Sequence, residues 1–150
     1  MGYRRQINDE NGSLAELAVE HLLQQHGTVE HRSDNHGSPD LILTTPTIKY
    51  GIEVKSISVY RHSKREKHQL GSVRIDKSSL QNLFSFCYEH SLKPLFIIEL
   101  RFIPPIGDHY FIITMDILRK YKILDTNHKT INLSFLFIYN HGIYFNYWEP

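Results

Sequence analysis

The sequence predicts an α/β domain with a mixed central β-sheet flanked by helices. Three observations lead to this fold class: helix-like and strand-like segments alternate along the chain, apolar residues recur at helical spacing in two stretches, and a tight turn joins two apolar strands near Pro46. A chain of 150 residues is long enough to bury a core and is expected to form one domain, 1–150.

The first half of the chain contains a predicted helix followed by three predicted strands. Ser13 and Glu16 form an S-x-x-E capping box at the helix start, and Gly27 is placed to end the helix. The apolar residues at helical spacing are Leu14, Ala15, Ala18, Leu22 and Leu23. Strands are expected at 28–32, 40–45 and 50–56, and a turn with Pro46 at its second position joins the last two.

The second half continues the alternation of helices and strands. Asp76 is placed to cap a helix whose apolar stripe is formed by Leu80, Leu83, Phe84 and Cys87. Strands at 95–102 and 109–115 follow, then a short helix at 116–122 and a C-terminal hairpin that turns at 140–142. The dense aromatic residues of this tail are expected to serve as core or subunit interface.

Composition excludes some settings. The single cysteine, Cys87, excludes an intramolecular disulfide, indicates a reducing, cytoplasmic location and is interpreted as a core residue. No apolar run is long enough to cross a membrane. The net charge is only +1, but the segment 61–77 is clearly basic. A basic segment on a neutral body is typical of a loop that faces phosphate, with a simple solvated loop as the alternative.

The predicted hairpin places three charges together. A turn centred between Pro46 and Thr47 puts Asp40 opposite Glu53, with Cβ atoms roughly 4.5–5.5 Å apart. Strand alternation puts Lys55 on the same face, and the apolar residues Leu41, Leu43, Ile52 and Val54 on the other. Two facing carboxylates repel unless a positive charge lies between them, and Mg²⁺ prefers such oxygen ligands. The alternative is a surface hairpin with a salt bridge.

The motif formed by Pro39-Asp40 and Glu53-Val54-Lys55 resembles the PD-(D/E)xK signature of restriction-endonuclease-like nucleases. Residues 12–27 resemble the first helix of archaeal-type Holliday junction resolvases, and the likeness covers about 12–115, leaving 116–150 as an extension. The resemblance implies a restriction-endonuclease-like core and metal-dependent hydrolysis of DNA phosphodiester bonds.

The resemblance also implies a role for each motif residue. Asp40 and Glu53 would bind Mg²⁺, for which Mn²⁺ is expected to substitute, with the Val54 carbonyl as a further ligand. Lys55 would orient or deprotonate the attacking water. Glu16 would hold a metal-bound water, although its capping box gives it a structural alternative. Ser33 is a candidate contact to the scissile phosphate.

In length and layout the whole chain resembles the homing endonucleases encoded in bacterial tRNA introns, which cut long duplex sites as tetramers. This resemblance implies a Mg²⁺-dependent, site-specific DNA endonuclease that works as a dimer or tetramer on double-stranded DNA. The alternatives are a Holliday junction resolvase, a restriction enzyme and a non-catalytic DNA-binding module. The candidate DNA-binding residues, besides Ser33, are Arg61, Lys64, Arg65, Lys67, His68, Gln69, Arg74 and Lys77.

Overall fold

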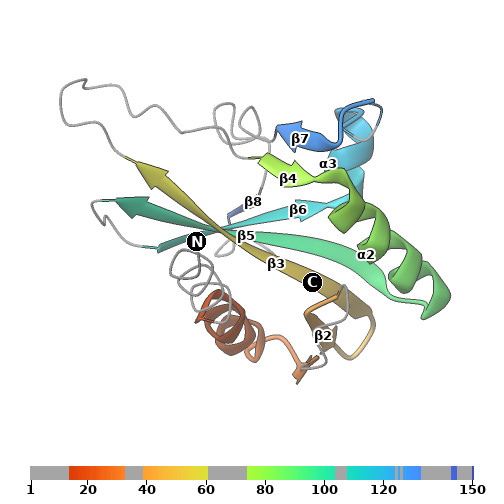
Figure 1. Ribbon diagram of the computed structural model, residues 1–150. Helices are drawn as coiled ribbons and strands as arrows, with labels where there is room; N and C mark the ends of the chain where they lie inside the picture. The colour runs from red at the N-terminus through yellow and green to blue at the C-terminus, as the bar shows by residue number, and fades with distance from the viewer. Residues whose placement is uncertain are drawn as a thin grey trace.

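The computed structural model describes residues 14–32, 39–60, 74–103, 108–123, 125, 127–132, 143–144 and 150 (Figure 1). An N-terminal helix covers residues 14–23. The elements that follow are β1 (Thr28–His31), β2 (Leu41–Thr44), β3 (Lys49–Tyr60), β4 (Arg74–Asp76), α2 (Lys77–Glu89), β5 (Lys93–Ile103), β6 (Asp108–Thr114), α3 (Met115–Lys120), β7 (Thr130–Asn132) and β8 (Ile143–Tyr144). None of the helices in these described stretches is long and apolar enough to cross a membrane.

The predicted mixed sheet is confirmed. Its strand order is β1-β2-β3-β5-β6-β8, and β3 and β5 run parallel while the other neighbours are antiparallel. Alternate residues of β5 enter two separate cores: Leu95 and Ile97 pack with the N-terminal helix, whereas Phe96 and Ile98 pack with α2. The two helices therefore cover opposite faces of the sheet (Figure 1).

The N-terminal helix buries a different stripe from the expected one. Ala15, Val19 and Leu23 are fully buried against the sheet. Leu14, expected in the core, is 58% exposed, because the buried stripe is set by Ala15 and its neighbours at four-residue spacing. Ser13, the expected cap, lies outside the described residues. Gly27 is not in a left-handed conformation; it is needed because a Cβ there would collide with the Thr44 carbonyl oxygen.

Helix α2 follows the prediction closely. Leu80, Leu83 and Cys87 are buried, and Phe84 packs beside them. Burial raises the pKa of the Cys87 thiol to about 11, so its expected place in the core is confirmed. Asp76 occupies the N-cap position, but its side chain makes no capping hydrogen bond. The predicted position of Asp76 is therefore confirmed, but the predicted capping hydrogen bond is wrong. Asp76 is also the last residue of strand β4.

Strands β4 and β7 form a second sheet that the sequence did not indicate. The sequence predicts residues 74–76 as the end of a basic loop and a helix cap, yet they pair antiparallel with Thr130–Asn132. Ile75 and Ile131 face each other across this pair and are both buried in the α2 core. Of the expected C-terminal hairpin only Ile143–Tyr144 is described, as a strand beside β6, and the remainder lies outside the described residues.

Strand β3 is longer than the expected 50–56. It runs parallel to β5 without a break from the pair Tyr50 and Lys93 to the pair Tyr60 and Ile103. Strand β2, by contrast, pairs with β3 only as far as Ile52. The edge of β3 beyond that point is therefore no longer covered by β2, and the predicted catalytic residues lie there.

Two close approaches of neighbouring atoms predict different outcomes for glycine substitution. A Cβ on Gly51 would lie 2.5 Å from the Cys87 sulfur, so Gly51→Ala should lower the free energy of unfolding by about 1–3 kcal/mol. Combining it with Cys87→Ala should recover part of that loss, because the obstructing atom is a side chain. In Gly27→Ala the added Cβ would collide with a backbone oxygen, so no side-chain substitution should recover the lost stability. Urea unfolding of the four variants measures this, and a strictly additive double variant would contradict it.

Candidate active site

The β2–β3 hairpin has the register that the turn predicts. Leu41 pairs with Ile52 and Leu43 with Tyr50, and the Thr45 N–H donates to the Ile48 carbonyl at 2.9 Å to close the turn. The Asp40 N–H donates to the Ile52 carbonyl at 2.9 Å, which continues the ladder by one step. The predicted register is therefore confirmed, and no bulge intervenes at Gly51.

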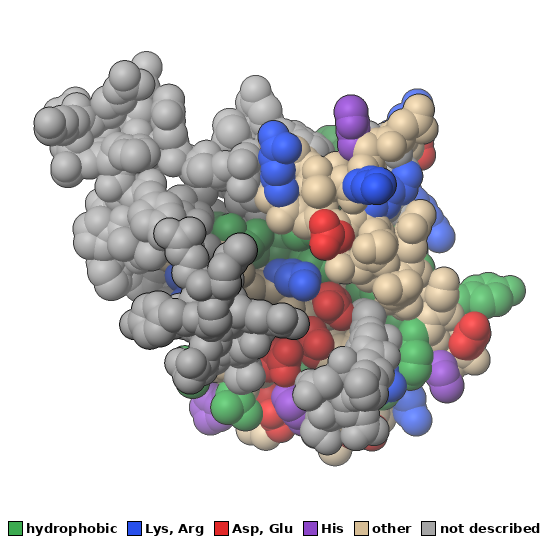
Figure 2. All heavy atoms as spheres, in the orientation of Figure 1, with side chains coloured by type: hydrophobic (Ala, Val, Ile, Leu, Met, Phe, Trp, Pro, Cys, Tyr) green, Lys and Arg blue, Asp and Glu red, His purple; other side chains and the backbone are tan. Residues whose placement is uncertain are grey.

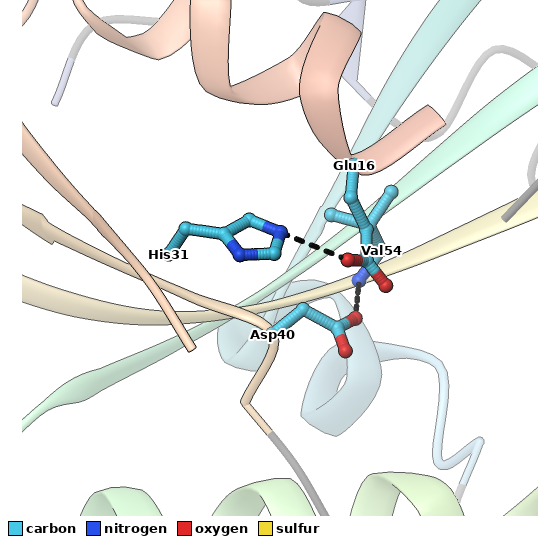
Figure 3. Close-up of polar contacts among 4 residues, drawn as sticks. All are labelled: Glu16, His31, Asp40 and Val54. Carbon is cyan, nitrogen blue, oxygen red and sulfur yellow. Dashed lines mark hydrogen bonds and ion pairs between the residues drawn. The ribbon is translucent and has the colours of Figure 1, made fainter. Parts of the chain in front are cut away.

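The Asp40 side chain occupies the place where the ladder stops. Its Oδ2 accepts a hydrogen bond from the Val54 N–H at 2.8 Å, as Figure 3 shows. Because β2 supplies no backbone partner beyond Ile52, the carboxylate satisfies a donor that would otherwise face the open edge of β3. The Asp40 carboxylate is thus fixed in place by backbone geometry at the strand edge.

Glu16 and His31 complete this acidic site from the other side. Glu16 extends from the N-terminal helix toward Asp40, and His31 Nε2 lies 3.1 Å from Glu16 Oε2 (Figure 3). The sequence predicts a role for Glu16 but none for His31. His31 could not be found from a local pattern, because the register of β1 against β2 is set across the segment 32–40, whose several turn-forming residues do not define one hairpin turn.

Burial dominates the electrostatics of both carboxyl groups. The pKa of Glu16 is raised, first by burial and next by the negative charge of Asp40, while His31 lowers it in part. The pKa of Asp40 is also raised by burial, against the opposing effects of the Val54 N–H and the positive charge of Lys55. The proximity of the two side chains raises the pKa of Glu16 and slightly lowers that of Asp40.

The raised pKa of Glu16 predicts a pH-dependent stability. A carboxyl whose pKa is higher in the folded state stabilises the fold at low pH and loses that contribution as pH rises through the folded value. Glu16→Gln should therefore gain stability relative to the natural chain as pH rises above 4.5, the ordinary pKa of Glu, in EDTA. Thermal unfolding measures this, with Glu20→Gln on the same helix as the control. A stability difference that stays constant over this range would contradict the prediction.

Glu53 and Lys55 lie on the α2 face of the sheet. Their alternation partners Ile52 and Val54 are buried in the core beneath the N-terminal helix, and Ile57 packs into the α2 core. Glu53 is 8% exposed, whereas Lys55 is partly exposed and close enough to lower the pKa of Asp40. Acidic side chains gather beside a basic one in the middle of the face shown in Figure 2.

The donor set suits a hard cation that also binds substrate. Across the described part of the chain, no three His, Cys, Asp or Glu side chains are gathered closely enough to form a complete metal cage. Mg²⁺ does not need one, because it is commonly held by one or two carboxylates together with water and substrate phosphate. Burial raises the pKa values of Glu16 and Asp40, and a cation bound beside them would favour their charged forms.

Arg32 is a second basic residue beside the site, and the sequence does not predict a role for it. Its guanidinium stacks on the Phe86 ring at 4.3 Å and donates to the Pro39 carbonyl at 3.3 Å. The backbone N–H of Arg32 donates to the backbone carbonyl of Asp40 at 2.9 Å. These contacts hold the chain immediately before Asp40 against α2, which explains how a residue at the end of a short strand keeps a fixed position.

The strand that carries Lys55 is also held by a buried polar cluster on its opposite face. Glu99 of β5 is 4% exposed, and its Oε1 accepts from the Ser56 hydroxyl at 3.1 Å. The Arg101 Nε lies 3.0 Å from the same oxygen. These contacts link Ser56 of β3 to Glu99, its paired residue in β5, directly after Lys55, and they give the buried carboxylate hydrogen-bonding partners.

Only two of the predicted DNA-binding residues are described. Arg74 is exposed in β4, and Lys77 is half-buried at the start of α2. The others, Ser33, Arg61, Lys64, Arg65, Lys67, His68 and Gln69, lie outside the described residues. Their roles remain predictions.

A search of the solved structures identifies a similar fold. The Holliday junction resolvase Hjc of the archaeal hyperthermophile Archaeoglobus fulgidus matches with a TM-score of 0.58 and 15% sequence identity, and the match covers 89% of this chain and 90% of that chain. The chain has a restriction-endonuclease-like fold. No protein-family model matches the sequence, and the curated proteins give no match. At this identity the likeness concerns the fold, and the arrangement of Asp40, Val54 and Glu16 comes from this chain alone.

Proposed function

We propose that this protein is a metal-dependent DNA endonuclease that hydrolyses phosphodiester bonds. The observation that carries the proposal is the position of Asp40: its carboxylate is fixed by the Val54 N–H at the edge of β3 where pairing with β2 ends, with Glu16 and Lys55 beside it. A restriction-endonuclease-like fold supports the proposal, since the resolvase with this fold is itself named as acting on DNA junctions.

In the proposed reaction, water attacks the phosphorus in line and the bond to the 3′ oxygen breaks, leaving a 5′-phosphate and a 3′-hydroxyl. Asp40, Glu53 and the Val54 carbonyl would hold Mg²⁺, which supplies charge stabilisation at the phosphate when bound. The Lys55 ammonium would donate to the attacking water or to a non-bridging phosphate oxygen. Glu16, held by His31, would orient a water on the helix side of the site. The water proton leaves to solvent, and the 3′ oxygen takes up a proton.

The target is proposed to be a long site in duplex DNA, in the manner of homing endonucleases. Strand β4 lies within the basic segment 61–77, and the exposed polar residues of β4 and of its partner β7 favour recognition of a particular sequence. A four-way junction is the second candidate, because the similar solved structure is a Holliday junction resolvase.

One experiment separates these functions. The purified full chain is incubated with Mg²⁺ and either a labelled four-way junction or a library of linear duplexes, with EDTA as the control. Cleavage of one linear site supports the homing type, and symmetric nicking of the junction irrespective of sequence supports the resolvase. Binding without any cleavage in Mg²⁺ or Mn²⁺ would overturn the proposed activity.

A further inference from the structure

The small sheet of β4 and β7 is a two-stranded ribbon with one buried and one exposed face. Ile75 pairs with Ile131, and both are buried in the α2 core. The residues on either side of them, Arg74 and Asp76 in β4 and Thr130 and Asn132 in β7, are all exposed. The ribbon is therefore attached firmly to the body by its apolar face while it presents a purely polar face to solvent.

Arg74 and Asn132 are direct cross-strand partners on that polar face. Such partners have Cβ atoms roughly 4.5–5.5 Å apart, so the two side chains extend from the ribbon side by side. They line a hollow of about 490 Å³ together with His128 and Thr130 and the apolar Ile123 and Ile131. The exposed face thus carries hydrogen-bonding side chains of several kinds around one depression.

The surroundings of the ribbon are basic. The Lys77 N–H donates to the Lys129 carbonyl at 2.8 Å, which joins the start of α2 to the residue before β7 and brings two lysines to one end of the ribbon. Basic side chains gather over β4, β7 and α3 in the upper right of Figure 2. The ribbon also packs on the same sheet face that bears Glu53 and Lys55, because Ile75, Ile131 and Ile57 share the α2 core. One DNA molecule could therefore contact both the catalytic residues and the ribbon from the same side of the sheet.

We propose that the β4–β7 ribbon enters the major groove of duplex DNA and that Arg74 and Asn132 read base edges there. This inference rests on the proposed endonuclease function. The major groove admits a two-stranded ribbon, arginine pairs bidentately with guanine O6 and N7, and asparagine pairs bidentately with adenine N6 and N7. The cross-strand pair therefore has the chemistry to read two neighbouring purines, while Lys77 and Lys129 hold the flanking phosphates.

The test selects bound duplexes from a random-sequence DNA library in EDTA, so that no cutting occurs, and sequences them. The natural full chain should enrich a defined site. Asn132→Ala should lose the preference at one position by roughly tenfold or more, while its affinity for random DNA changes by less than about twofold. Arg74→Lys keeps the charge but not the planar fork, so it should lose the preference at a neighbouring position with an unchanged salt dependence.

The controls separate recognition from folding and from the proposed activity. Lys93→Ala, an exposed lysine at the start of β5, should leave the selected site unchanged, and Asn132→Asp repeats the test with nearly the same side-chain size. Thermal midpoints of all variants should agree, because the substituted side chains are exposed. If the variants select the same site as the natural chain, or the natural chain cuts DNA without selecting any sequence, base reading by the ribbon is overturned. A natural chain that neither binds nor cuts DNA overturns the endonuclease function itself.

Discussion

Replacing Lys55 by alanine is expected to abolish DNA cleavage while leaving DNA affinity nearly unchanged. Lys55 contributes one positive charge near Asp40 on the open edge of β3, where a scissile phosphate would lie. Loss of one positioned donor of this kind typically lowers a rate by roughly 10²–10⁴-fold. Single-turnover cleavage of a cognate duplex or junction measures the rate, and gel-shift titration in EDTA measures the affinity.

Lys49→Ala is the matched control for Lys55→Ala. Lys49 lies on the same strand but at its far end, where it is exposed and pairs with Thr44. The Lys49→Ala variant should therefore cleave DNA at the same rate as the natural chain. Natural cleavage by Lys55→Ala would show that the PD-(D/E)xK motif was misassigned, and equal losses in both variants would point to general charge rather than to the active site.

Asp40→Asn is expected to separate stability from activity. Asparagine retains an oxygen that accepts from the Val54 N–H, yet it removes the charge that opposes Glu16. The metal-free variant should thus unfold at the same temperature as the natural chain or at a higher one. Its cleavage rate in Mg²⁺ should fall by roughly 10³-fold or more, because the carboxylate proposed to hold the ion has been neutralised.

A metal titration provides a readout for Asp40→Asn that is independent of activity. The natural chain should be stabilised by Mg²⁺ or Mn²⁺ in thermal unfolding, since an ion that binds only the folded state shifts the equilibrium by mass action. Asp40→Asn should lose most of this shift, and Asp125→Asn, an exposed aspartate remote from the hairpin in sequence, should keep it. If Mg²⁺ or Mn²⁺ raised the unfolding temperature of Asp40→Asn as much as that of the natural chain, the metal would have to bind at another site.

The hairpin could be predicted from the sequence because its information is local. Once Pro46 and Thr47 are taken as the turn centre, counting outward fixes the partner of every residue in β2 and β3. The same reasoning separates Leu41 and Ile52, which enter one core, from the charged residues of the other face. Helix α2 was equally readable, because its buried stripe of Leu80, Leu83 and Cys87 follows helical spacing.

The remaining features depend on contacts between distant segments. Glu16 meets His31 only after the N-terminal helix has packed on the sheet, and Arg32 stacks on Phe86 across more than fifty residues of chain. Strand β4 is three residues long and becomes a strand only because β7 pairs with it. Segments this short contain too few residues to show a periodic pattern. The β4–β7 ribbon therefore could not be predicted from the sequence.

The parallel pairing of β3 with β5 has a consequence for the order in which the molecule folds. Strand β3 meets β2 through a tight turn but meets β5 only after the chain has passed through α2. Local pairs form quickly and distant parallel pairs slowly. A chain emerging from the ribosome would therefore place Asp40 opposite Glu53 well before the second edge of β3 is covered. The strand that carries Glu53 and Lys55 would thus gain its second neighbour late, and the candidate site would become rigid only after β5 has been synthesised and has paired with it.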